Sequence, residues 1–125
     1  KEILNSDESA YQTIEPKIIN QGMVSPDNLQ IVRQAMRQTV LAGSARSLQS
    51  LPVATAGKTG TAQFDSSKAT HSWFTGFAPF DQPKMVLTIL VEEGGESTDA
   101  AVPIAKDFWQ WYFTTIDTPE GYSVK

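Results

Sequence analysis

One short segment of the chain places a lysine and two threonines among glycines. Residues 57–61 read GKTGT, and the residues around them extend a strand-like pattern over residues 53–64. Glycine lets a ligand backbone come close, because it has no Cβ atom. The ammonium group of Lys58 and the hydroxyl groups of Thr59 and Thr61 are therefore suited to binding a carboxylate.

The letters Gly-Lys-Thr also occur in the phosphate-binding loop of nucleotide-binding proteins. That loop needs another glycine five positions earlier and a helix directly after it. Pro52 takes the position of the first glycine, and Gly60 would weaken the first turn of the helix. We therefore disfavour a nucleotide site. A third interpretation, a lysine that discourages aggregation at a sheet edge, stays open for these letters alone.

Strand periodicity predicts how these side chains are divided. Successive side chains on a strand point to opposite faces. If residues 53–64 form a strand, Thr59 and Thr61 share one face, and Lys58 and Gly60 share the other. The two hydroxyl groups can then bind one carboxylate side by side, and no bulky neighbour on its own face blocks Lys58.

Two more strand-like runs follow this segment. Residues 71–79 read HSWFTGFAP, and residues 85–92 read MVLTILVE, which is rich in β-branched and apolar types. The joins between the runs are short, so antiparallel pairing is expected. We predict a three-strand meander over residues 53–92, closed by Gly94 and Gly95.

Two helices are predicted on either side of the meander. The first covers residues 25–43, with Ser25 as N-cap and Pro26 at the first helical position. Its apolar stripe, which we expect in the core, consists of Leu29, Val32, Ala35, Met36 and Val40.

The second helix is predicted over residues 99–114, with Asp99 as its cap and Pro103 in its first turn. The side chains expected to cover the sheet are Ile104, Phe108, Trp111 and Tyr112. Trp109 and Phe113 widen this aromatic surface, and we expect part of it to meet protein outside the chain.

The chain as a whole is predicted to be one α+β subdomain over residues 1–125, with an antiparallel sheet meander packed by a C-terminal helix. Residues 1–24 are expected to be an irregular β segment with a short hairpin near residues 11–20. Residues 115–125 are expected to form a turn and a frayed tail.

Composition narrows the function classes. The net charge is −4, which argues against nucleic-acid binding, because proteins that read nucleic acids carry basic faces. The chain has no cysteine and one histidine, so we predict no metal and no cofactor. No apolar run reaches the roughly 20 residues of a membrane span. The chain starts at Lys1 without Met or a signal peptide, so we interpret it as part of a longer protein.

Four stretches together resemble a known family. They are residues 56–63 (AGKTGTAQ), 71–79 (HSWFTGFAP), 91–95 (VEEGG) and 100–106 (AAVPIAK). In this order and spacing they resemble the C-terminal part of class B penicillin-binding proteins, the monofunctional peptidoglycan transpeptidases, over residues 25–114. Within this class, the segment SWFTGFAP is most similar to penicillin-binding protein 2, the elongation type.

The resemblance implies a fold, a function and roles for the motif. The fold would be a fragment of the penicillin-binding and serine β-lactamase-like transpeptidase fold. Lys58 would meet the serine of a Ser-x-Asn motif and assist acylation, and the threonines would hold the carboxylate of a stem peptide or β-lactam. The N–H of Thr61 would join the oxyanion hole, a contribution of about 3 kcal/mol. The implied site has Lys58 and Thr61 as catalytic residues and Lys58, Thr59, Gly60 and Thr61 as substrate-binding residues.

The family's nucleophile is missing from these 125 residues. No Ser-x-x-Lys and no Ser-x-Asn occurs, so the chain alone is expected to be inactive. The implied partners are peptidoglycan stem peptides, β-lactams and the remainder of the transpeptidase domain, outside the cytoplasm in a membrane-anchored parent. Alternatives are a non-catalytic β-lactam- or peptide-binding sensor domain and a serine β-lactamase relative. An exposed sheet edge would favour a homodimer of the fragment.

Five other positions carry weaker signals. His71 is expected to pack and hydrogen-bond rather than act as a base. Glu92 and Glu93 are adjacent and so face opposite ways on a strand. Trp73 is expected in the core more than at a cleft. Gln63 lies past the expected ligand contact.

Overall fold

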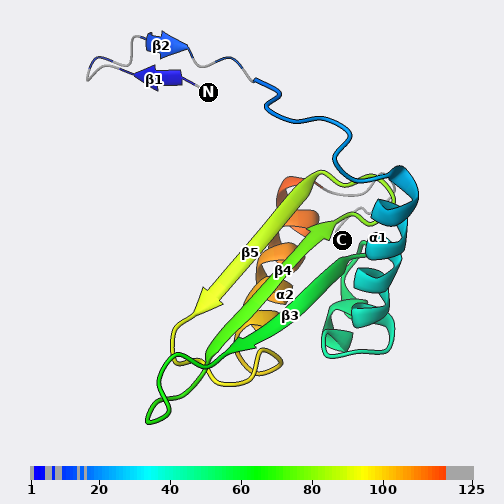
Figure 1. Cartoon of the computed structure of the whole chain (residues 1–125), viewed down its shortest axis with the longest axis vertical. Coiled ribbons are helices and arrows are strands. Elements are labelled where there is room, and N and C mark those ends of the chain that lie inside the picture. The colour runs from blue at the N-terminus through cyan, green and yellow to red at the C-terminus, as the bar shows by residue number, and fades with distance from the viewer. Residues whose placement is uncertain (1, 5–6, 8–9, 14, 16, 118–125) are drawn as a thin grey trace.

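The computed structural model describes residues 2–4, 7, 10–13, 15 and 17–117, and the predicted tail beyond residue 117 lies outside this range. The elements are β1 (Glu2–Leu4), β2 (Ala10–Thr13), α1 (Pro26–Leu41), η1 (Arg46–Ser50), β3 (Ala56–Ala62), β4 (His71–Ala78), β5 (Met85–Val91), α2 (Ala101–Trp111) and η2 (Tyr112–Ile116). Figure 1 shows α1 beside β3 and α2 behind the three-stranded sheet.

The meander has the predicted topology. Strands β3, β4 and β5 pair in chain order, and both pairs are antiparallel. β3 is shorter than the predicted run of residues 53–64, because the carbonyls before it bind other elements. Ala54 O accepts from the Phe80 N–H at 2.7 Å, and Thr55 O accepts from the Arg37 side chain at 2.7 Å.

Helix α1 begins as its sequence predicts. The Ser25 hydroxyl accepts the Asn28 N–H at 3.3 Å, and Pro26 is the first helical residue. The expected core stripe is wrong in its first half, where Leu29 and Val32 are 51% and 55% exposed. The helix meets the core only toward its C-terminal end, where Val40 is fully buried.

Helix α2 meets the core with only part of the predicted face. Phe108 and Tyr112 pack against the buried cluster, as predicted. Ile104 and Trp111 are 47% and 51% exposed, whereas Trp109 is fully buried and Phe113 in η2 is 1% exposed. The small buried residues Ala101 and Ala105 allow the helix to pack closely against the core. The positions of the large apolar side chains alone do not indicate which face of the helix is buried.

The start of α2 is also different from the prediction. Asp99 is not the cap, because the N-cap position is Ala100 and its side chain makes no capping bond. The N–H of Ala101 instead donates to the Ser72 hydroxyl of β4 at 3.2 Å, in the buried interior. Pro103 lies in the first turn, as predicted.

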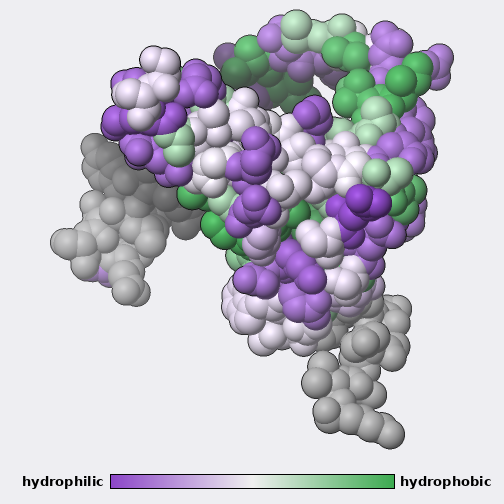
Figure 2. Space-filling model, turned by 90° about the horizontal axis from the view of Figure 1, so that it is seen from below, coloured by the Kyte–Doolittle hydropathy of each residue, from purple (hydrophilic) through white to green (hydrophobic). Residues whose placement is uncertain are grey.

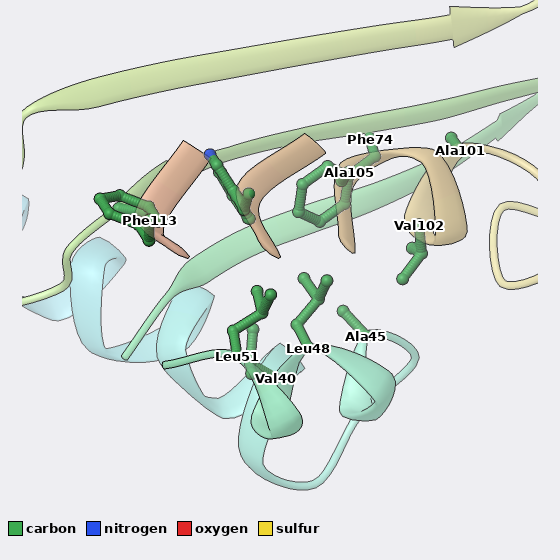
Figure 3. Packing of buried hydrophobic residues seen from close by; sticks show 11 residues of the cluster. Val40, Ala45, Leu48, Leu51, Phe74, Ala101, Val102, Ala105 and Phe113 are labelled. Atoms are coloured by element: carbon green, nitrogen blue, oxygen red, sulfur yellow. The ribbon is translucent and has the colours of Figure 1, made fainter. Parts of the chain in front are cut away.

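The core is formed around α2. Figure 3 shows Phe74 on the sheet side of α2, and Leu48 of η1 facing Val102 from the other side. The sequence reasoning did not identify η1, although it contributes the buried Leu48 and is followed by the buried Leu51. The helix is therefore held between the sheet and η1.

The N-terminal hairpin lies earlier in the chain than predicted near residues 11–20. β1 and β2 pair antiparallel, with Glu2 opposite Thr13 and Leu4 opposite Ala10. Residues 17–25 form neither helix nor strand, and Figure 1 shows the hairpin at the far end of this connection from the sheet.

Two arginines of α1 hold the chain around the start of β3. Arg37 donates to Thr55 O, and Arg33 donates to Phe80 O, each at 2.7 Å. The Arg33 guanidinium also lies 5.3 Å from the centre of the Phe77 ring. Because β3 follows Thr55 directly, these bonds fix α1 against the strand that carries Lys58.

Replacement of Arg37 with alanine is expected to lower the free energy of unfolding by about 2 kcal/mol, because the buried Thr55 carbonyl loses a charged donor. Urea denaturation followed by circular dichroism measures this loss. Arg46→Ala is the charge-matched control, since Arg46 is exposed, and its expected change is below about 0.5 kcal/mol. Equal losses in both variants would contradict the role given to Arg37.

The surface at the lower end of the sheet is mainly polar. Figure 2 views the molecule from that end, and hydrophilic and intermediate residues cover much of the face. Among the described residues, no helix combines the length and the apolar character that a membrane crossing needs.

Candidate functional site on strand β3

The side chains of β3 alternate as predicted. Lys58 pairs with Thr75 of β4, and both line a cavity beside α1. Thr59 pairs with Phe74, which is fully buried on the α2 side. Lys58 and Thr59 therefore belong to opposite faces of a strand that is terminal in the described sheet.

The cavity next to Lys58 has a volume of about 470 Å³. Its lining residues are Ile31, Val32, Ala35, Met36, Thr39, Lys58 and Thr75. The α1 wall is mostly apolar, and it includes Val32 and Met36, which the sequence analysis expected in the core. The Lys58 ammonium donates to the carbonyl of its neighbour Thr59. Lysine has three N–H donors, so two more are available for another group.

The two glycines of the motif have different roles. A Cβ atom on Gly57 would lie 2.5 Å from the Phe74 ring, so Gly57 serves core packing rather than ligand approach. A Cβ atom on Gly60 would meet only the Trp73 Cβ, at 3.3 Å. Ala56 and Gly57 are buried, and Thr61 is exposed. The second half of β3 is thus the part that a ligand can reach.

The hydroxyl of Thr59 has a partner that the sequence analysis missed. Its Oγ1 lies 2.7 Å from the Oγ of Ser44, in the loop between α1 and η1. No local sequence signal connects two residues separated by 15 positions. Thr61 lies opposite the buried Ser72 of β4, on the same face as Thr59.

The residues around the motif have mainly packing roles. His71 stacks on Phe64 with ring centroids 4.0 Å apart, and its Nδ1 accepts the Glu93 N–H at 3.1 Å. This agrees with the prediction that His71 packs. Glu93 is paired with Lys68 at 2.9 Å. Trp73 is 38% exposed on the face that carries Lys58, so its expected place in the core is wrong.

The loop after β3 is held by local hydrogen bonds. The N–H and the hydroxyl of Ser67 both donate to Asp65. These two hydrogen bonds, the one from the N–H more than the one from the hydroxyl, lower the pKa of the Asp65 carboxyl group. Gln63 donates to the Asp65 and Lys68 carbonyls, so its side chain supports the loop.

Comparison with known proteins identifies the family. Residues 2–110 match the family described as penicillin binding protein transpeptidase domain. The chain belongs to this family. The chain is 37% identical over 84 residues to the peptidoglycan D,D-transpeptidase MrdA of Haemophilus influenzae, and the match covers 55% of the chain and 13% of that relative. The resemblance seen in the four sequence stretches is thereby confirmed.

Solved structures of the family have the same fold. A structure of Pseudomonas aeruginosa penicillin-binding protein 2 is 28% identical with a TM-score of 0.70, over 90% of this chain and 25% of that one. A ceftriaxone acyl-enzyme complex of penicillin-binding protein A from M. tuberculosis is 25% identical with a TM-score of 0.71. This match covers 84% of the chain described here and 25% of that structure's chain. The α+β prediction is confirmed. The chain thus spans about a quarter of these structures, and about an eighth of MrdA.

Proposed function

We propose that this transpeptidase chain supplies the substrate-binding strand of a peptidoglycan D,D-transpeptidase. The observation that carries the proposal is the accessible second half of β3, which presents Lys58 on one face and Thr59 and Thr61 on the other. A ligand lying along this strand would meet one ammonium and two hydroxyl groups within four residues. The family match supports the same assignment.

The proposed chemistry is transfer of an acyl group through a serine ester. The hydroxyls of Thr59 and Thr61 hold the terminal carboxylate of a stem peptide or the carboxylate of a β-lactam. A serine from sequence outside these 125 residues attacks the carbonyl carbon, and the N–H of Thr61 stabilises the resulting oxyanion. Collapse of the oxyanion breaks the amide C–N bond, and the terminal residue of the stem peptide leaves as an amine that takes up the serine proton. An amine of another stem peptide then displaces the serine oxygen from the ester, which forms the cross-link and returns a proton to the serine.

Lys58 has a place in this scheme that its contacts support. Its ammonium lies at the apolar cavity and holds only a neighbouring backbone carbonyl among the contacts that the structure describes. A serine hydroxyl entering the cavity would receive a charged donor in an environment of low polarity, where such a bond is strong. Lys58 would then assist proton transfer during acylation.

Exposed apolar side chains support a packing surface for the rest of the domain. Ile31 and Val32 of α1 are 66% and 55% exposed, and Leu90 of β5 is 44% exposed. We propose that the remainder of the transpeptidase domain covers these residues, outside the cytoplasm in a membrane-anchored protein. A homodimer of the isolated chain would cover the same residues, and a strictly monomeric chain in analytical ultracentrifugation would contradict this homodimer.

Labelling with a fluorescent penicillin tests the proposed function. The intact protein that contains this sequence is expected to keep the label through denaturing electrophoresis, because the acyl-serine bond is covalent. The 125-residue chain alone is expected to stay unlabelled, since it has no Ser-x-x-Lys. An unlabelled intact protein with its fold retained would refute the proposal, and a labelled isolated chain would place the nucleophile within these residues.

A further inference from the structure

The hydroxyl pair of Ser44 and Thr59 joins the loop after α1 to the proposed substrate-binding strand. The two oxygens are 2.7 Å apart, which is a normal length for a hydrogen bond between hydroxyl groups. Nothing in the GKTGT segment itself requires Ser44. The question is therefore what this bond does for Thr59.

Both partners are held in place by their surroundings. On the Ser44 side, Gly43 packs so closely that a Cβ atom there would lie 2.9 Å from the Thr39 backbone. Ala45 is fully buried, and its N–H donates to Thr39 O at 3.1 Å. The backbone of Ser44 is thus held in place by the packing of Gly43 and Ala45, whereas the Ser44 side chain is at the surface. The loop presents one hydroxyl group to the strand.

On the other side, Thr59 is fixed by strand pairing. Its partner on β4 is Phe74, which is fully buried and packs edge-to-face on Trp109. The backbone of Thr59 therefore cannot shift to improve the bond without disturbing the core. A contact made by two fixed groups costs little ordering entropy when a ligand arrives.

The direction of the bond determines how Thr59 meets an anion. A threonine hydroxyl has one proton and two acceptor lone pairs. If Thr59 donates to Ser44, it turns only lone pairs toward a carboxylate, which repels them. If Ser44 donates to Thr59, the Thr59 proton is free for the ligand. A bound carboxylate therefore selects the second arrangement, in which two hydroxyl bonds in series strengthen each other.

We propose that Ser44 is a positioning residue that donates to Thr59 and so directs the Thr59 proton to the ligand carboxylate. This inference rests on the proposed function, in which Thr59 binds that carboxylate. Ser44 itself does not touch the ligand. Its effect is specific to ligands with a negative charge at this position.

The test is acylation of the intact protein by a penicillin and by the methyl ester of the same penicillin. Ser44→Ala is expected to lower the acylation rate constant for the acid about three- to tenfold, which is the effect of one neutral hydrogen bond. The rate constant for the ester is expected to change less than about twofold. Ser44→Thr keeps a hydroxyl group and is expected to restore the rate for the acid.

Two further variants separate positioning from stability. Ser50→Ala is the matched control, because the Ser50 hydroxyl donates to Ser47 O within η1. Ser44→Cys keeps an unbranched side chain with one atom beyond Cβ, although sulfur is larger than oxygen, and it weakens the donor. It is therefore expected to resemble Ser44→Ala even if alanine loosens the loop. Melting temperatures of all variants are measured beside the rates.

The outcomes are distinct. The proposal for Ser44 would be overturned if Ser44→Ala and Ser44→Cys lowered the acylation rate constant equally for the acid and the ester. It would also be overturned if neither variant lowered the rate constant for the acid. Loss for the acid alone, with rescue by threonine, supports it. A wild-type protein that is acylated by neither compound would instead refute the proposed function on which this inference rests.

Discussion

Replacement of Lys58 with alanine in the intact protein is expected to slow acylation by penicillin about 10²- to 10³-fold. This magnitude is typical of removing one preorganised donor that acts on the transition state. The Lys58 ammonium lies beside the cavity into which we propose that the serine enters, and no other ammonium or guanidinium lines that cavity among the described residues. Stopped-flow measurement of the second-order acylation rate constant checks the prediction.

Two other lysine variants determine the meaning of this loss. Lys58→Arg keeps the positive charge, but its guanidinium does not lose a proton near neutral pH. If Lys58 only supplies charge, the arginine variant recovers most of the rate, whereas proton transfer requires that it does not. Lys84→Ala is the control, because it breaks the exposed pair with Asp117 at 2.8 Å. Its expected effect on acylation is less than twofold, and a similar loss in Lys58→Ala and Lys84→Ala would contradict the role of Lys58.

The parts of the fold that the sequence predicted depend on local signals. Strand alternation predicted how Lys58 and Thr59 divide between two faces, and the structure agrees. The Ser25 cap was also predictable, because it acts on an N–H three residues later. The three-strand meander follows from short joins between apolar runs. In each case the signal lies within one element or in the short join between two neighbouring elements.

The predictions that failed depend on contacts between distant segments. Asp99 is a good cap by type, yet Ser72, 29 residues before Ala101, binds the start of α2. Gly57 was read as space for a ligand, but the ring of Phe74 occupies that space. The partner of Thr59 in the candidate site is Ser44, from a loop that has no catalytic signature. Periodicity within one element contains no information on such neighbours.

The prediction for α2 has the largest energetic consequence, and it is right for Phe108 and Tyr112 but wrong for Ile104 and Trp111. Trp109 is fully buried and meets Phe74 edge-to-face at 5.8 Å, whereas Trp111, two residues later, is half exposed. Trp109→Ala is expected to lower the free energy of unfolding by about 3–5 kcal/mol, because it removes the largest buried side chain and leaves a cavity. Urea denaturation followed by circular dichroism at 222 nm measures the loss.

Trp111→Ala is the matched control, since it removes the same side chain from the same helix. With 51% of Trp111 exposed, the expected loss is about 1 kcal/mol or less. Trp109→Phe is expected to lie between the two alanine variants. It removes part of the ring volume, but it also removes an indole N–H that is buried without a hydrogen-bond partner among the described residues. A larger loss in Trp111→Ala than in Trp109→Ala would mean that α2 packs through Ile104 and Trp111, which the structure leaves half exposed. The position of the core between the sheet and η1 would then be wrong.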